Sequence, residues 1–357
     1  MYPFIFILTS FGIRFTSVKE KRQMSSSTIE YYTYVSEQIM VYLGLFCLVA
    51  GVVGNIFNLI VFLSLKTFRN NTCAFYLTIT AIVDIGQLLT GLLTRITITG
   101  FDNDITLSSL FYCKFRAYFY QFFSGTSISC MCAAAINQYL CTCSNPRWQQ
   151  WSKIKINYGA AIGIIIFWFL HGIPYLIYNN LIPLPGGLAC AYSNEVFDQY
   201  AVYGFTAFLT GFFPMIINGT FAFLAHRNIQ QIERRALPAV HQELDKQMTA
   251  IVLVQFIYHT ISTLPYIIVS IISYNPTLNA DPLIEARIEI ASSVTIFILY
   301  MNYAVPFYMY IFVSPRFRRQ FIYAFFQVCI NRWRQRIRVI NQVTPRPSNP
   351  NIRTNDH

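Results

Sequence analysis

The sequence predicts an all-α membrane protein, a seven-transmembrane helix bundle with a short amphipathic eighth helix. The chain of 357 residues is 55% hydrophobic and only 11% charged, whereas a soluble domain carries about 25% charged residues. Seven long stretches hold almost no charge. Each is long enough to cross a hydrocarbon layer about 30 Å thick as a helix. The stretches are 38–65, 70–94, 117–146, 156–194, 199–226, 247–280 and 290–315.

The distribution of Lys and Arg predicts the orientation in the membrane. Basic residues gather in 66–73, 141–155, 225–248 and the tail from 314. They are sparse around 95–116, 175–199 and 273–289. Because basic loops stay in the cytoplasm, we expect a multi-pass protein of the plasma membrane with an extracellular N-terminus and a cytoplasmic C-terminus. The net charge of +11 follows this pattern and is therefore no sign of nucleic-acid binding.

The expected organisation has four parts. They are an extracellular segment 1–37, a seven-helix domain 38–313, an amphipathic helix 314–330 and a disordered cytoplasmic tail 331–357. The apolar run 2–12 is too short to span a bilayer. Met24 is an alternative start site, which would remove the basic residues before it from the outer side.

The segment after the last apolar stretch has the pattern of an interfacial helix. Phe317, Phe321 and Phe325 repeat every four residues, with basic residues between the first two. Such an apolar stripe beside cationic side chains suits the inner membrane surface. Cys329 ends the segment and is a candidate for lipidation, with an unmodified cysteine as the alternative.

Single residues inside the apolar stretches carry further information. Asp84 is the only acid in any of them, and an acid in lipid costs enough free energy to indicate a functional site. Pro214, Pro265 and Pro306 are candidate helix hinges, because proline removes a backbone hydrogen bond of a helix. Two of the nine cysteines, Cys113 and Cys190, lie on the expected outer side. Disulfides persist there, so these two form a natural pair.

These features, taken in order, resemble the rhodopsin-like (class A) G-protein-coupled receptors over about residues 38–326. The matching markers are Gly54-Asn55, Asp84, Cys113 with Cys190, Trp168, Phe213-Pro214, Pro265, Pro306 with Tyr310, and Phe317. The resemblance implies a receptor and not an enzyme. It would bind an extracellular ligand and activate a heterotrimeric G protein through outward movement of the sixth helix.

The departures indicate a divergent, orphan-type member. Asn137-Gln138-Tyr139 stands where the family usually has Asp-Arg-Tyr. The resemblance implies that this segment, Asp245 and Tyr310 face the G protein. Gln138 carries no charge, so its contact with Asp245 would be a hydrogen bond instead of a salt bridge. A charge-assisted bond is about twice as strong, and we therefore expect a more loosely held inactive state.

Two more family motifs are altered. The sixth helix reads Ser262-Thr263-Leu264-Pro265 where the family has Cys-Trp-x-Pro. In the seventh helix, Val305 replaces the asparagine of Asn-Pro-x-x-Tyr, and one extra residue precedes Tyr310. A local bulge is one way for the helix to accommodate the extra residue.

The resemblance also implies a polar core around Asp84. Ser127 matches a serine that lines a sodium site in the family, and Asn302 and Asn55 are the expected neighbours. One carboxylate with hydroxyl and amide oxygens suits Na⁺, which is the only cofactor we expect. The alternative is a neutral, hydrogen-bonded carboxyl that packs between helices.

The expected ligand pocket excludes two ligand classes. Tyr120 stands where amine receptors have an aspartate, so a monoamine has no counter-charge. The seventh helix has no lysine for a retinal Schiff base, and Leu299 occupies the matching place. Aromatic walls with a charged rim favour a peptide; the alternative is that the aromatics only pack helices or form the interfacial belt. The expected pocket residues are Tyr120, Gln121, Tyr192, Tyr266 and Tyr300, and the rim is Arg95, Lys114, Arg116, Glu285, Arg287 and Glu289.

Other functions fit less well. His171 and His259 have no carboxylate motif beside them, which argues against an intramembrane enzyme. A transporter or a non-signalling seven-helix protein is the stronger rival. A transporter would usually show inverted repeats or several polar residues along a path, and the sequence has neither.

Overall fold

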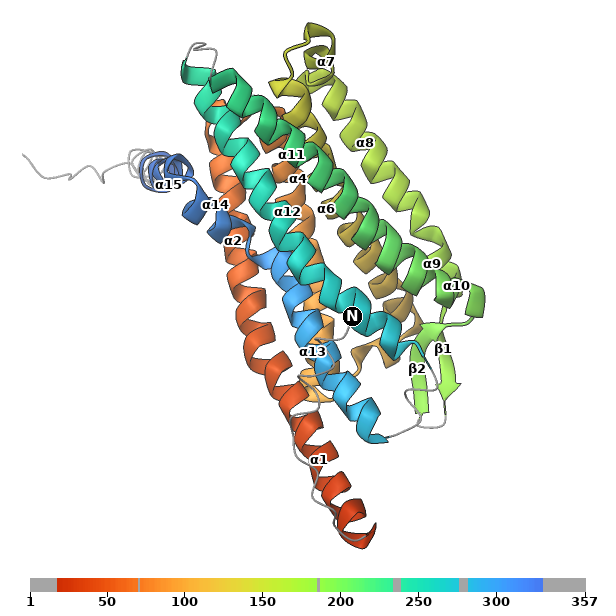
Figure 1. Cartoon of the computed structure of the whole chain (residues 1–357). Helices are drawn as coiled ribbons and strands as arrows, with labels where there is room; N and C mark the ends of the chain where they lie inside the picture. The colour runs from red at the N-terminus through yellow and green to blue at the C-terminus, as the bar shows by residue number, and fades with distance from the viewer. Residues whose placement is uncertain (1–17, 70, 185–186, 234–238, 276–281, 330–357) are drawn as a thin grey trace, which may run out of the picture.

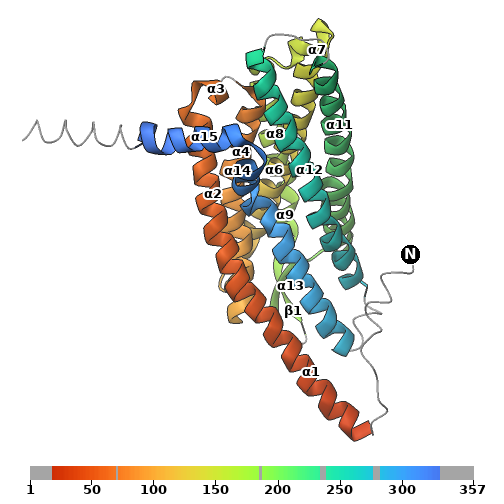
Figure 2. The ribbon, with the colours of Figure 1, turned by 60° about the vertical axis from the view of Figure 1, so that its left-hand side comes forward.

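The computed structural model describes residues 18–69, 71–184, 187–233, 239–275 and 282–329. Long helices lie side by side in a single bundle (Figure 1). A β-hairpin lies at one end of the bundle, called here the hairpin end. Helix α15 (Pro315–Ile322) lies at the opposite end, called the α15 end (Figures 1 and 2).

The first four long helices cross between these ends. The first consists of α1 (Val18–Gln38), a π-helical turn (Ile39–Gly44) and α2 (Leu45–Ser64). The second consists of α4 (Thr72–Gln87), a π-helical turn (Leu88–Leu92), α5 (Leu93–Arg95) and a further π-helical turn (Ile96–Gly100). The third is α6 (Leu110–Thr142), and the fourth is α8 (Ile154–His171) with α9 (Ile173–Tyr178). Short elements connect them: α3 (Lys66–Arg69), a 3-10 turn (Ile105–Leu107) and α7 (Pro146–Trp151).

The remaining helices complete the bundle. The fifth consists of α10 (Glu195–Gln199), a long π-helical segment (Tyr200–Phe212) and α11 (Phe213–Glu233). The sixth is α12 (Ala239–Ser273). The seventh is α13 (Pro282–Ala304) followed by α14 (Pro306–Val313). After it come α15 and a π-helical segment (Tyr323–Cys329).

The first helix begins earlier than expected. Its apolar stretch starts near residue 38, but α1 already begins at Val18. Segment 18–23 reads Val-Lys-Glu-Lys-Arg-Gln, and Lys, Glu, Arg and Gln are good helix formers. The helix therefore extends past the part suited to lipid, and α1 projects beyond the hairpin end (Figure 2).

Apolarity identifies most of the membrane spans but not all. Among the described residues, five helices are long and apolar enough to cross a membrane, or six when the bent pair α13 and α14 counts as one span. Helix α6 is not among them, although its 33 residues suffice in length. It contacts α4, α8, α11 and α12, and it buries polar side chains such as Gln121, Ser124 and Gln138 against them. A helix that faces protein on most sides needs less apolar surface than one that faces lipid.

The connection after the fourth helix is a β-hairpin, the one sheet among the described residues of this helical bundle. Strands β1 (Asn179–Leu184) and β2 (Gly187–Tyr192) pair antiparallel, with Leu181 opposite Cys190. The charge-free run continues to residue 194, so charge alone did not separate helix from strand. Pro183 cannot donate a helical hydrogen bond, which is consistent with the end of the helix at Tyr178.

Helix α15 and the π-helical segment after it pack on the bundle through the phenylalanines of the four-residue repeat. Phe321 and Phe325 lie 5.3 and 5.7 Å from the ring of Phe57 in α2. Phe317 is fully buried between Phe62 and Tyr310. The helix therefore lies across the end of the bundle, as Figure 2 shows.

The three candidate hinge prolines lie at different kinds of position. Pro265 is inside α12, and Pro214 follows the π-helical segment near the start of α11. Pro306 begins α14 directly after Val305, where the seventh helix bends by 61°. Residues 306–313 are α-helical. The extra residue before Tyr310 therefore does not form a bulge there, and the irregularity lies at Val305.

Gly51 permits a close approach of three helices. A Cβ at this position would lie 2.6 Å from Leu88 Cδ1 and 2.9 Å from the backbone Cα of Ala304. We expect Gly51→Leu to prevent folding, because a backbone atom cannot yield to a new side chain. The control is Gly163→Leu, since a Cβ there meets nothing within 4 Å. Surface expression should be lost only in the first variant, and equal expression of both would contradict this packing.

Candidate functional site

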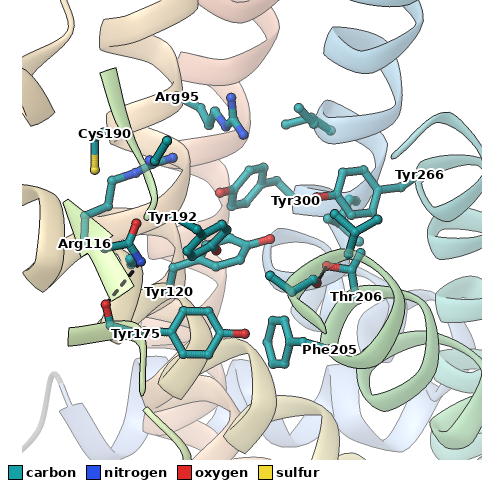
Figure 3. Close-up of a pocket in the computed structure, with 17 residues that line it drawn as sticks. Arg95, Arg116, Tyr120, Tyr175, Cys190, Tyr192, Phe205, Thr206, Tyr266 and Tyr300 are labelled. Carbon is teal, nitrogen blue, oxygen red and sulfur yellow. Dashed lines mark hydrogen bonds between the residues drawn. The ribbon is translucent and has the colours of Figure 1, made fainter. Parts of the chain in front are cut away.

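A cavity of about 290 Å³ opens between the helices near the hairpin end. Its walls come from the second, third, fifth, sixth and seventh helices, with α9, β1 and β2 completing them. Figure 3 shows the labelled side chains gathered around this space. Its size is near the lower limit of ligand pockets in proteins. It therefore fits a small molecule or one end of a longer molecule.

Tyrosines form much of the cavity wall. Tyr120, Tyr192, Tyr266 and Tyr300, four of the five expected pocket residues, line it. Burial raises the pKa of Tyr192 to about 12. Its hydroxyl therefore keeps its proton at neutral pH and can donate a hydrogen bond to a ligand.

Gln121 does not line the cavity, which corrects the fifth expectation. Its side chain is fully buried, and its Nε2 lies 2.7 Å from His171 Nδ1 in the fourth helix. The other ring nitrogen of His171 lies 2.6 Å from the hydroxyl of Tyr200. Consecutive residues of an α-helix point about 100° apart. Tyr120 can therefore face the cavity while Gln121 joins helices on another side.

The cavity wall also contains two arginines that were expected at the rim. Arg95 and Arg116 line the cavity itself; in Figure 3, Arg95 appears near Tyr300 and Arg116 near Tyr192. The second helix continues past Arg95 to Gly100 through a π-helical turn. This places Arg95 inside the bundle instead of at its edge.

The expected disulfide is present and shapes the cavity. Cys113 near the start of α6 bonds to Cys190 in β2, with their Cα atoms 5.8 Å apart. The cross-link fixes β2 against α6 beside Arg116. Ala191 and Tyr192, which follow Cys190, thereby become part of the cavity wall.

A second, smaller cavity surrounds Asp84. It has a volume of about 30 Å³, and Asp84, Ser127 and Asn302 all line it. Ser127 donates a 2.6 Å hydrogen bond to Asp84 Oδ1. Asn302 accepts from Ser262 at 2.8 Å and lies 3.4 Å from Thr263. The residues in place of the family's Cys-Trp thus connect the sixth and seventh helices.

Asn55 is not part of this cavity. Its Nδ2 donates to the carbonyl oxygens of Gly51 and Tyr303, at 2.9 and 2.7 Å. It therefore joins the first helix to the seventh. The small cavity instead contains His259, whose ring Nε2 is buried and has no hydrogen-bond partner.

At the α15 end, most of the residues expected to face a G protein are buried. Gln138 is fully buried, and its Nε2 donates a 2.9 Å hydrogen bond to Thr249 Oγ1 in α12. Asn137 is also buried. Tyr310 is buried and accepts a 2.6 Å hydrogen bond from Gln255. Tyr139 is only partly buried and packs against Phe221.

The structure describes two further expected residues, Asp245 and Cys329, by their backbone alone. The backbone of Asp245 belongs to α12 and that of Cys329 ends the last π-helical segment. Their side chains lie outside the described residues. The side chain of Gln138 bonds to Thr249, which lies about one helical turn after Asp245.

Sequence reasoning missed Thr249 and Gln255, and it considered His259 only as a catalytic residue. All three lie on α12 and are buried. Gln255 and His259 stand on one face, because their separation of four residues is close to one turn of 3.6, whereas Thr249, six residues before Gln255, points to another side. A search for polar residues one turn apart along the sixth helix would have found Gln255 and His259, but no such spacing indicates Thr249.

Comparison with known families agrees with this architecture. The sequence profile described as 7 transmembrane receptor (rhodopsin family) matches residues 54–310. No curated protein sequence matches the chain. The matched region begins at Gly54, includes the disulfide and both cavities, and ends at Tyr310. The chain therefore belongs to the rhodopsin family of seven-transmembrane receptors.

Proposed function

We propose that this protein binds an extracellular ligand in the larger cavity and activates a heterotrimeric G protein. The hairpin end would face the outside of the plasma membrane, and the α15 end the cytoplasm. The observation that carries this proposal is the larger cavity. It contacts the fifth, sixth and seventh helices at once, so a ligand there touches the helices whose arrangement must change.

At the α15 end, hydrogen bonds between helices hold the closed arrangement, and such a change would break them. Gln138 and Thr249 join α6 to α12, and Gln255 and Tyr310 join α12 to α14. Both bonds must break when α12 moves outward. A ligand that prefers the moved arrangement shifts the population toward it. Asn137, Gln138 and Tyr310 would then become accessible to the G protein.

A peptide remains the favoured ligand. The wall offers phenol rings for apolar contact and phenol hydroxyls for hydrogen bonds to amides. The cavity of about 290 Å³ accommodates one end of a peptide, and the hairpin beside it offers further surface.

The test is G-protein dissociation in cells that express the full chain, with and without a peptide library. Gln138→Arg is measured in parallel, because it restores the charge usual in the family. A peptide-dependent signal in the native chain supports the proposal. Silence of both forms at verified surface expression would contradict it and favour a transporter or a non-signalling protein.

We also propose that the smaller cavity binds Na⁺ and that Na⁺ favours the closed arrangement. The residues fit such an ion, because the Asp84 carboxylate, the Ser127 hydroxyl and the Asn302 amide oxygen are hard ligands. A volume of about 30 Å³ accepts one small ion or one water. Asn55, which lies outside this cavity, is not a ligand in this proposal.

Asp84→Asn should abolish the dependence of signalling on sodium. The amide keeps the shape of the side chain and removes the negative charge that attracts the cation. The measurement compares ligand dose-response curves in sodium and in N-methylglucamine chloride. Sodium dependence that persists in Asp84→Asn would show that the ion acts elsewhere.

A further inference from the structure

Two cationic side chains line the larger cavity without an acidic partner in it. The residues that line it include Arg95 and Arg116, and among the described residues none of them is Asp or Glu. Arg116 Nε is buried and has no hydrogen-bond partner. A buried cation is normally paired, so this arrangement lacks its counter-charge.

Among the described residues, no acid of the cavity wall compensates the charge of Arg116. Burial first, and then the positive charge of Arg95, lower the pKa of Arg116, whereas Tyr300, Tyr120 and Asp104, an acid in the loop after the second helix, raise it. Asp104 Oδ1 already accepts hydrogen bonds from the backbone N–H and the hydroxyl of Thr106. Asp104 therefore caps its own turn and does not lie in the cavity wall.

The rest of the wall is apolar or aromatic. Phe205, Ile296 and Leu299 lie with the tyrosines around the same space. In Figure 3, Arg95 and Arg116 lie toward one side of it and Phe205 toward another. A ligand that satisfies both sides carries an anionic group next to an apolar group.

We propose that the larger cavity binds a carboxylate that is attached to an apolar or aromatic group. Arg95 and Arg116 supply the counter-charges, and phenol hydroxyls add hydrogen bonds. An arginine guanidinium matches the two oxygens of a carboxylate with parallel N–H donors. The C-terminus of a peptide and a small organic acid both provide this chemistry. The inference deepens the proposed function, because it names the ligand class of that cavity.

The test uses the purified full chain in lipid nanodiscs and follows its thermal unfolding. The probes are 3-phenylpropanoate and a tetrapeptide ending in Phe with a free C-terminus. Each is compared with its neutral amide. We expect the acids to raise the unfolding temperature and the amides to leave it unchanged. A shift with the tetrapeptide alone identifies a peptide terminus, and a shift with phenylpropanoate identifies a small acid as sufficient.

Variants tie the effect to the two arginines. Arg95→Gln and Arg116→Gln should each weaken the acid by about 10- to 100-fold, since each loses a charge-assisted hydrogen bond. Arg116→Lys keeps the positive charge but lacks the planar guanidinium with its parallel N–H donors. Its affinity for the acid should lie between that of the native chain and that of Arg116→Gln. The matched control is Arg287→Gln, which removes a charge from an exposed residue near the same end and should retain full binding.

The unliganded variants provide an independent measure. Arg116→Gln should unfold at the same or a higher temperature than the native chain, because it removes a cation whose Nε is buried without a hydrogen-bond partner. Equal shifts by acid and amide, no shift with any acid, or full binding in both Gln variants would overturn the proposal.

The two proposals fail in different ways. An acid-specific thermal shift without G-protein dissociation in cells contradicts the proposed signalling function and retains the carboxylate site. Peptide amides that activate the G protein as well as their acids contradict the carboxylate site and retain the signalling function.

Discussion

Replacement of both Cys113 and Cys190 by serine should abolish the ligand response and lower thermal stability. The disulfide connects residues 77 apart in sequence. A cross-link of this kind typically contributes about 2–4 kcal/mol, which for a chain of 357 residues corresponds to a fall of roughly 3–5 °C in the unfolding temperature. The ligand response should suffer more than folding does, because β2 supplies Ala191 and Tyr192 to the cavity.

The measurements are the unfolding temperature in nanodiscs and ligand-stimulated G-protein dissociation at matched surface expression. The single variants Cys113→Ser and Cys190→Ser should each equal the double variant, because all three lose the same bond. An unchanged ligand response in the double variant would show that the hairpin holds its position without the disulfide.

The fold was predictable because the membrane imposes a strong rule on sequence. Helices that face lipid must be apolar over about 20 residues, and the α8 helix, with mostly exposed apolar side chains, obeys it. The rule does not apply to residues that lie outside the lipid. It therefore predicts that the first helix starts at residue 38, although the polar α1 before it is also helical. It also could not separate α9 from β1, since both are free of charge.

The candidate site was predictable where a side chain occupies a position with a known counterpart. The Cys113–Cys190 disulfide and the neighbours of Asp84 on the third and seventh helices are of this kind. Contacts that depend on the rotation of a helix were not predictable from spacing in the chain. Tyr120 and Gln121 are adjacent, yet only Tyr120 faces the cavity.

The sequence also did not indicate how deep inside the bundle the two arginines lie. Charged residues near the end of a span usually reach water, and a rim position was expected for Arg95 and Arg116. The π-helical turns extend the second helix past Arg95, and the hairpin lies beside Arg116. Both features depend on tertiary structure, so composition could not indicate that these charges line the cavity.

Thr249→Val should raise basal G-protein activity by up to about fivefold. Gln138 Nε2 donates to Thr249 Oγ1 at 2.9 Å, and both side chains are buried at the α15 end. Valine keeps the shape of threonine and removes the acceptor. A neutral hydrogen bond contributes about 1 kcal/mol, which changes the ratio of closed to open arrangements by about that factor.

Two controls isolate this bond. Thr249→Ser keeps the hydroxyl and should behave like the native chain. Thr260→Val removes a hydroxyl from the same helix that bonds only to its own helix, at Phe256 O, and should leave basal activity unchanged. Basal G-protein dissociation without ligand is the measurement. If Thr249→Val matches both controls, the bond between α6 and α12 does not hold the closed arrangement, and the contact between Gln255 and Tyr310 becomes the next one to remove.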